Sequence, residues 1–187
     1  NTQPALFVTS IATLRALQER LPDASPSFTA GHSLGEYTAL VASGAISFEV
    51  GLRLVRERAR LMREAGEAHP GAMGVFLGIE VDLARQVCED ASNQTGEPLV
   101  IANDNCPGQI VISGGARAVE VAIEHSKQVG ATRSQRLALS VAAHSPLMAS
   151  AAEQFNQLLQ TAPFQTPAFA VYGNVTAEPL TTPHSII

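Results

Sequence analysis

The sequence lacks the features that mark several broad classes of protein. It contains no apolar run long enough to span a bilayer. Only two of its 187 residues are cysteines, and their number and spacing predict neither a disulfide framework nor a metal site. The net charge of -5 argues against a nucleic-acid partner, because binding to phosphates favours a positively charged surface. Because no secretory signal is visible either, we expect a protein of the reducing cytoplasm with no membrane partner.

The residue patterns in the two terminal parts of the chain predict helices with a few short strands between them. A first helix follows Pro4, with apolar residues at helical spacing: Phe7, Ile11, Leu14, Leu17 and Leu21. The other elements expected in these parts are a strand at Phe28–Ala30, helices from Tyr37 to Gly44, from Phe48 to Ala65 and from Ser145 to Leu159, and a strand at Ala168–Tyr172.

The middle of the chain alternates short strands with amphipathic helices. The expected elements are Met73–Ile79, Leu83–Ala91, Leu99–Asn103, Gln109–Ser113, Ala118–Val129 and Arg136–Val141. Their order, βαββαβ, is typical of a ferredoxin-like domain. We therefore predict an α/β fold in which a small ferredoxin-like domain, residues 69–141, is inserted into a large α/β domain, residues 1–68 and 142–187.

A single serine stands between two glycines where a predicted strand meets a predicted helix. Gly31-His32-Ser33-Leu34-Gly35 fits the G-x-S-x-G pattern of a nucleophile elbow, a strained turn in which both flanking glycines make room for the serine. In such a turn the backbone N–H of Leu34 lies at a helix N-terminus and can bind an oxyanion. The alternative is an ordinary glycine-rich turn. The placement favours Ser33 as a nucleophile.

A serine nucleophile needs a base, and the chain contains five histidines. His144 is expected at the end of a strand, directly before the helix that starts at Ser145-Pro146, and its small neighbours leave space around the ring. An ordinary histidine in a capped loop is the alternative for this position. The others are expected in loops, on a solvated helix face or beside the serine: His32, His69, His125 and His184.

Arg58 is expected on the buried face of its helix. Its neighbours three and four positions away are all apolar: Leu54, Val55, Leu61 and Met62. A buried guanidinium needs an anionic partner or several acceptors, and arginine can hold a carboxylate through two parallel hydrogen bonds. Arg58 is therefore a candidate for binding a carboxylate, with an ion pair in the core as the structural alternative.

The serine motif, extended to Glu36, resembles the GHSxGE signature of malonyl-CoA:acyl carrier protein transacylases and of the acyltransferase domains of polyketide and fatty acid synthases. Five further segments resemble this family in the same order along the chain: Gln3–Leu6, Val55–Met62, Asn103–Gly114, Ala143–Met148 and Gly173–Ala177. The resemblance therefore covers nearly the whole chain and is far more specific than one elbow motif.

The resemblance implies an α/β-hydrolase-like large domain with the ferredoxin-like small domain inserted. It also implies transfer of malonyl from malonyl-CoA to the phosphopantetheine thiol of an acyl carrier protein, through an ester of Ser33 and with His144 as the base. Arg58 matches the arginine that binds the malonyl carboxylate. Other positions expected to contact the substrate are His32, Leu34, Ala143 and Asn103. No cofactor or metal is expected, because CoA enters as part of the substrate.

Two departures from the family pattern concern segments that this sequence does not contain. The family's N-terminal GQGxQ segment, whose glutamine supplies a second oxyanion donor, is absent, and so is a glutamine beyond Gly173–Ala177. The large domain is therefore expected to be incomplete at both ends. Three alternatives stay open: an acyl hydrolase of the same fold, a docking module without turnover, and an acyltransferase domain cut from a multidomain synthase. Arg58 argues against a hydrolase of simple acyl groups, which carry no free carboxylate.

Overall fold

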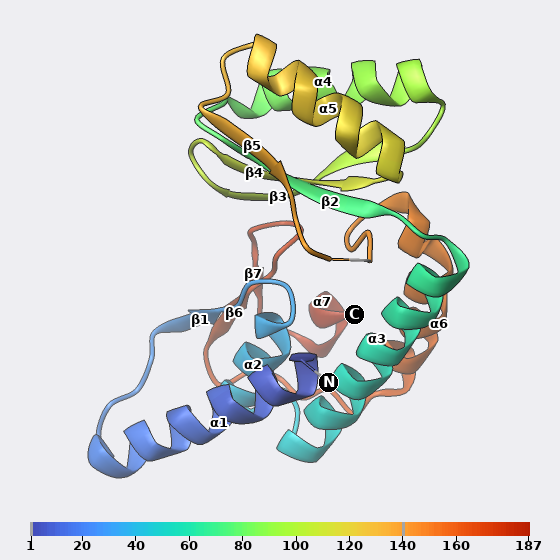
Figure 1. The fold of residues 1–187 in the computed structure, drawn as a ribbon. Helices are drawn as coiled ribbons and strands as arrows, with labels where there is room; N and C mark the ends of the chain where they lie inside the picture. The colour runs from blue at the N-terminus through green and yellow to red at the C-terminus, as the bar shows by residue number, and fades with distance from the viewer. Residues whose placement is uncertain (1, 140) are drawn as a thin grey trace. The chain divides into compact units, whose positions relative to one another are not determined.

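The computed structural model describes residues 2–139 and 141–187 (Figure 1). The chain forms both helices and strands along its whole length, so the predicted α/β fold is confirmed. The chain divides into two compact units. The first unit comprises the segments up to Arg60 and from Gln154 onward, and the second unit is Leu61–Glu153. Within the described residues, no helix combines the length and the hydropathy needed to cross a membrane.

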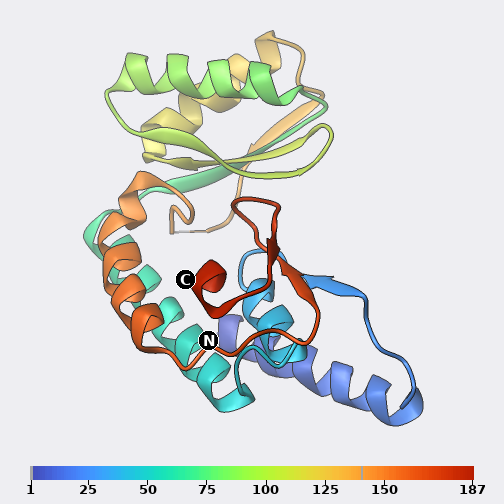
Figure 2. The same cartoon turned by 180° about the vertical axis from the view of Figure 1, so that it is seen from behind.

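The first unit combines a small sheet with helices from both ends of the chain (Figure 2). Its strands are β1 (Phe28–Ala30), β6 (Ala170–Tyr172) and β7 (Pro179–Leu180), in the order β1-β6-β7. β1 pairs in parallel with β6. The helices are α1 (Thr2–Arg20), α2 (Gly35–Ala42), α7 (Pro183–Ile186), most of α3 (Phe48–Ala68) and most of α6 (Ala149–Thr161).

A cluster of buried apolar side chains joins α1 to α3 in the first unit. Phe7 and Ile11 of α1 pack with Val55 of α3, and the Phe7 ring stacks on Phe48 with centroids 5.6 Å apart. Phe7 and Ile11 are the buried residues of α1, whereas Leu17 is 52% exposed. The helical repeat of apolar residues thus identifies α1 correctly, but it does not mark a buried face along the whole helix.

A second cluster packs α2 and α3 against the sheet of the first unit. Its buried members are Ala39, Leu40, Ala45, Ile46, Leu54, Phe164, Val171 and Leu180. Tyr37 of α2 meets Phe155 of α6 edge to face, with ring centroids 6.0 Å apart. These contacts hold α2 next to the sheet, and α2 is the helix that follows Ser33 in the chain.

The second unit is built on a four-stranded antiparallel sheet. Its strands are β2 (Ala72–Leu77), β3 (Leu99–Cys106), β4 (Gln109–Gly114) and β5 (Arg133–Arg136), in the order β3-β4-β2-β5. Helices α4 (Val81–Thr95) and α5 (Ala116–Gln128) lie side by side on one face of this sheet in Figure 1 and Figure 2. They cover the buried side chains of Phe76, Ile110 and Ile112. The predicted βαββαβ order is present.

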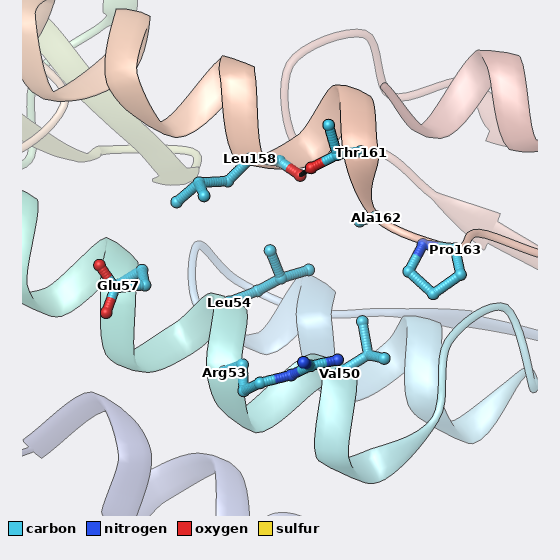
Figure 3. A pocket seen from close by; sticks show the side chains of 8 residues that line it. All are labelled: Val50, Arg53, Leu54, Glu57, Leu158, Thr161, Ala162 and Pro163. Atoms are coloured by element: carbon cyan, nitrogen blue, oxygen red, sulfur yellow. Dashed lines mark hydrogen bonds between the residues drawn. The ribbon is translucent and has the colours of Figure 1, made fainter.

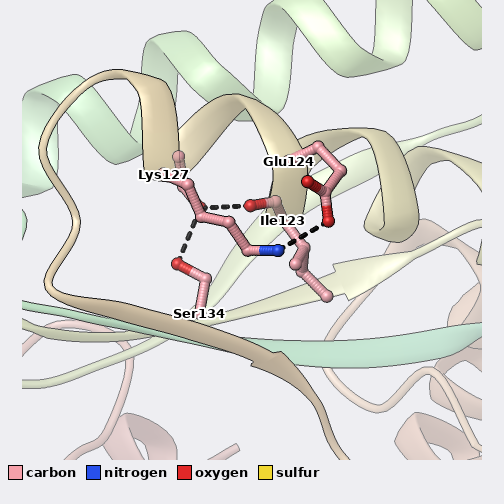
Figure 4. Close-up of polar contacts among 5 residues, drawn as sticks. Ile123, Glu124, Lys127 and Ser134 are labelled. Atoms are coloured by element: carbon pink, nitrogen blue, oxygen red, sulfur yellow. Dashed lines mark hydrogen bonds and ion pairs between the residues drawn. The ribbon is translucent and has the colours of Figure 1, made fainter.

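The last strand of the second unit lies earlier in the chain than the sequence predicts. The prediction is Arg136–Val141, whereas β5 ends at Arg136, and Ser140 lies outside the described residues. β5 is a polar edge strand paired with β2, and Ser126 of α5 donates to Ser134 Oγ at 2.7 Å (Figure 4). The prediction was wrong because it followed the apolar residues after Arg136, and the sheet instead pairs the polar residues before them.

The boundaries between the units also differ from the predicted positions, 68/69 and 141/142. The end of α3 and the segment 142–153 belong to the second unit. This segment packs closely against the start of β2: a Cβ added to Gly71 would lie 2.7 Å from Ala142 Cβ and 2.9 Å from Leu147 Cδ1. Close packing of that kind explains why the segment groups with the sheet of the second unit.

Phe7→Ala is expected to lower the free energy of unfolding by about 3–5 kcal/mol, because it removes a fully buried ring and leaves a cavity between α1 and α3. The matched control Leu6→Ala changes the neighbouring side chain, which is 55% exposed, and should shift stability by less than about 0.5 kcal/mol. Chemical denaturation followed by circular dichroism measures both. Equal losses in the two variants would contradict the packing of α1.

Candidate active site

Ser33 lies in a sharp turn between β1 and α2. Its φ of 51° is left-handed, a conformation that costs a non-glycine residue about 1–3 kcal/mol and persists only where the surroundings hold it. Gly31 is required, because a Cβ there would lie 2.0 Å from the carbonyl carbon of Gly35. Gly35 is not required for space, because a Cβ there would meet no atom of the described residues within 4 Å apart from its chain neighbours and the nearby backbone of α2. The prediction that both glycines make room is therefore wrong for Gly35.

Asn174 and Glu36 hold the turn around Ser33. The Ser33 N–H donates to Asn174 Oδ1 at 3.0 Å, and Asn174 Nδ2 donates to the Gly31 carbonyl at 2.8 Å. Glu36 Oε2 accepts from the backbone N–H of Asn174, at 2.8 Å, and also from its Nδ2. Sequence reasoning assigned neither residue a role. The signal was present, because Glu36 closes the serine motif and Asn174 lies in the matched segment Gly173–Ala177.

The guanidinium of Arg58, on α3, reaches the serine. Its Nη2 donates to Ser33 Oγ at 2.9 Å, and its Nη1 donates to Gln3 Oε1 at 2.5 Å. Both partners are neutral, and within the described residues no carboxylate forms an ion pair with Arg58. Burial lowers the pKa of Arg58, although arginine stays protonated in proteins. A half-buried cation whose partners are neutral is suited to receive an anion.

Tyr37 lies next to this charged group but is not a candidate base. Burial raises the pKa of Tyr37 to about 12, with Arg58 acting in the opposite direction and Glu36 in the same direction. The phenol therefore stays neutral at physiological pH. Its ring packs against Phe155, so its role is to support α2 behind the serine turn.

The N-terminus of α2 offers a backbone donor beside Ser33. Leu34 directly precedes the helix, and its N–H has no acceptor among the described residues. Such an N–H, at the positive end of a helix dipole, can bind an oxyanion. His32 is exposed and, with Tyr172 and Asn174, lines an open pocket of about 340 Å³. The first unit thus brings Ser33, Leu34 and Arg58 together, with His32 beside them.

His144 belongs to the second unit and lies in a turn, not at the end of a strand as predicted. The turn precedes a short 3₁₀ helix, η1 (Pro146–Met148), and the φ of His144 is 59°. The chain has already left the sheet at Arg136, which explains the difference. Ser145 holds the turn, because its Oγ donates to the Ala142 carbonyl at 2.7 Å and accepts from the Leu147 N–H. Ser145 is the N-cap of η1, so the predicted helix start at Ser145-Pro146 is confirmed.

The remaining substrate-binding candidates also lie in the second unit. Asn103 is half-buried on β3, next to an irregularity in the pairing of β3 with β4. Ala143 is half-buried in the turn that carries His144. Their contacts with a substrate stay predictions.

Two other features do not involve the serine turn. A cavity of about 270 Å³ in the first unit is lined by Leu54 of α3 and Leu158 of α6, with Arg53 at its edge (Figure 3). Both cysteines are free thiols. Cys88 is buried, which raises its pKa to about 12, and Cys106 is exposed.

Comparison with known proteins gives these residues a family context. The acyl transferase domain family matches residues 1–186. A malonyl CoA-acyl carrier protein transacylase of Bacillus subtilis (strain 168) is 45% identical over 97% of the chain, which spans 56% of that relative. The structure of an acyl-carrier-protein S-malonyltransferase from Burkholderia pseudomallei 1710b matches the whole of the present chain and 60% of the length of the transferase chain, at 38% identity and a TM-score of 0.93. A further match is a chain in the structure of a type II PKS acyl-carrier protein in complex with its malonyl-transacylase. The match covers 99% of the present chain and 59% of that chain, at 40% identity and a TM-score of 0.93.

Gly31→Ala and Gly35→Ala form a matched pair around the serine. Gly31→Ala should reduce the reactivity of Ser33 by about 10²-fold, because backbone atoms must move and a displacement of about 1 Å is worth that much. Gly35→Ala should keep it within about threefold of native, because the added methyl group meets open space. Labelling with a fluorophosphonate, followed by intact mass spectrometry, gives both rates. A loss confined to Gly35→Ala would refute this account of the turn.

Proposed function

The chain belongs to the acyl transferase domain family, and from this we propose that it carries the reactive serine of a malonyl-CoA:acyl carrier protein transacylase. One observation carries the proposal: a half-buried arginine donates to the candidate nucleophile, with Arg58 Nη2 2.9 Å from Ser33 Oγ. A cation beside a nucleophilic hydroxyl suits an acyl group that bears a free carboxylate. Relatives named malonyl CoA-acyl carrier protein transacylase support malonyl as that group and an acyl carrier protein as the acceptor.

We propose in addition that the first unit is α/β-hydrolase-like and the second unit ferredoxin-like. The first proposal is supported by the serine turn, which follows a strand of a parallel pair and precedes a helix. The second is supported by the βαββαβ order, the antiparallel sheet order β3-β4-β2-β5 and the two helices on one face.

In the proposed first step, Ser33 Oγ attacks the thioester carbonyl of malonyl-CoA. His144 takes the hydroxyl proton as general base, and Leu34 N–H donates to the carbonyl oxygen as it becomes negative. The C–S bond then breaks, the CoA sulfur leaves with the proton from His144, and a malonyl ester of Ser33 remains. His144 is proposed because the segment Ala143–Met148 matches the family and an imidazole titrates near neutrality.

Arg58 is proposed to exchange partners when the substrate binds. Its two terminal nitrogens donate to Gln3 and Ser33 in the structure, and two such nitrogens match the two oxygens of a carboxylate. A malonyl carboxylate would replace these partners and free Ser33 Oγ to give its proton to His144. An acyl group without a carboxylate offers no replacement, so the guanidinium would stay bound to the hydroxyl. Selectivity for a dicarboxylic acyl group follows.

The proposed second step repeats the first with a different nucleophile. The phosphopantetheine thiol of an acyl carrier protein attacks the ester carbonyl, His144 takes the thiol proton, and Ser33 Oγ leaves with it. Neither step changes an oxidation state, and His144 and the Leu34 N–H fill the roles of base and oxyanion donor, so we propose that the reaction uses no metal or redox cofactor. The free thiols of Cys88 and Cys106 support a reducing cytoplasm as the compartment.

Ser33→Ala is expected to abolish covalent uptake of malonyl from malonyl-CoA, and His144→Ala to slow it by about 10²–10⁴-fold, the usual contribution of a general base. Intact mass spectrometry at timed intervals measures the malonyl adduct. His125→Ala, on α5, is the matched histidine control and should leave loading unchanged. Uptake by Ser33→Ala would refute the serine ester. Release of free malonate at the same rate with and without carrier protein would favour the hydrolase alternative.

Arg58→Ala is expected to lose malonyl loading and to keep or gain acetyl loading from acetyl-CoA. Removing one side of a buried charged hydrogen-bonded pair costs about 2–5 kcal/mol, and only malonyl forms that pair. The control Arg56→Ala removes an exposed arginine from the same helix and should change neither rate. The ratio of the two loading rates is the measurement. Equal losses of both substrates in Arg58→Ala would mean that this arginine is structural.

A further inference from the structure

We propose that Glu36 and Asn174 are a positioning pair that fixes the backbone of the serine turn and thereby sets the reactivity of Ser33. The proposal rests on the proposed serine chemistry and adds to it two residues that act through the backbone. Asn174 binds the turn on both sides of His32, and Glu36 binds Asn174. The two come from distant parts of the chain, Glu36 from α2 and Asn174 from the loop after β6.

The side-chain amide of Asn174 joins the two ends of the serine turn. Its Oδ1 accepts from the Ser33 N–H at 3.0 Å, and its Nδ2 donates to the Gly31 carbonyl at 2.8 Å. Gly31 follows β1 directly, and Ser33 leads into α2. A single amide group therefore holds the backbone before and after the turn, which is the restraint that a serine with left-handed φ requires.

Glu36 determines which way the Asn174 amide faces. Its Oε2 accepts from both the backbone N–H and the Nδ2 of Asn174. Because an ionised carboxylate only accepts hydrogen bonds, the NH₂ group must face Glu36, and Oδ1 is then turned toward the Ser33 N–H. A flipped amide would place Oδ1 against Oε2 and would point two donors, Nδ2 and the Ser33 N–H, at each other. Glu36 thus makes one orientation of Asn174 the stable one.

The pair also determines which backbone N–H is available to donate a hydrogen bond to the oxyanion. The Ser33 N–H is engaged by Asn174, whereas the Leu34 N–H has no acceptor among the described residues. Fixing Ser33 therefore fixes the peptide plane that carries the Leu34 N–H. Loss of Asn174 would disturb the nucleophile and the oxyanion donor together, so the effect is expected on the rate of acylation and not on the binding of malonyl-CoA.

Three variants and a matched control test this pair, with fluorophosphonate labelling of Ser33 as the main readout. Asn174→Ala should slow labelling by about 10²-fold, the effect of a displacement of about 1 Å at a reacting group. Glu36→Ala should slow it by about 10-fold or more, because a hydrogen-bond acceptor for two donors is lost. Glu36→Gln should stay within about fivefold of native, because both bonds go to one oxygen and a glutamine carries one such oxygen. Val175→Ala changes the neighbouring side chain, which is 98% exposed, and should have no effect.

The outcomes distinguish a positioning role from a purely structural role. They also distinguish failure of this proposal from failure of the proposed function. Asn174 is exposed, so the variants should melt near the native temperature, and kcat for malonyl transfer should fall with an unchanged KM. A native labelling rate in Asn174→Ala, or a loss in Glu36→Gln equal to that in Glu36→Ala, overturns the proposal. Labelling does not involve malonyl. If the native protein fails to take up malonyl while labelling follows the expected series, the proposed function fails and the positioning pair stands.

Discussion

The left-handed backbone at Ser33 is the constraint on which the rest of the site depends. A serine adopts this conformation only where its surroundings impose it, at a cost of about 1–3 kcal/mol. Three features hold Ser33 in this conformation. Gly31 allows the chain to pass within contact of Gly35, and Asn174 accepts a hydrogen bond from the Ser33 N–H. Packing of Tyr37 against Phe155 holds α2 in place. If the turn relaxed, Oγ would move away from Arg58 and the Leu34 N–H would change direction.

The hydrogen bond between Arg58 and Ser33 shows how several elements converge on one hydroxyl. Arg58 comes from α3, Ser33 from the turn after β1, and Gln3, the other partner of Arg58, from the first turn of α1. The cluster of Phe7, Ile11 and Val55 fixes α1 against α3, and so keeps Gln3 and Arg58 within reach of each other. The packing of the first unit therefore has a direct chemical consequence, because it holds a cation next to a nucleophile while no carboxylate of the described residues forms an ion pair with that cation.

The sequence predicts the features that depend on local pattern. The strand, the serine turn and α2 are recovered because the glycines and the apolar spacing act within a few residues, and the βαββαβ order of the second unit is recovered for the same reason. The pair of Glu36 and Asn174 is missed, because the two residues are 138 positions apart and meet where β1 pairs with β6 and α2 contacts β6. β5 is misplaced because its pairing with β2, not its own hydropathy, selects the polar residues Arg133–Arg136. The need for Gly35 is overestimated, since the motif alone does not show where open space lies.

Ser33 and His144 share an unusual backbone, with φ values of 51° and 59°, although they lie in different units. Glycine adopts such angles without strain and asparagine does so more readily than most residues, so either substitution would relax the chain locally. Thermodynamic stability and chemical competence thus conflict at the two residues for which the chemistry is proposed. A laboratory selection for heat resistance alone would enrich proteins that had lost one of them, and a programme to stabilise this chain should hold both positions constant.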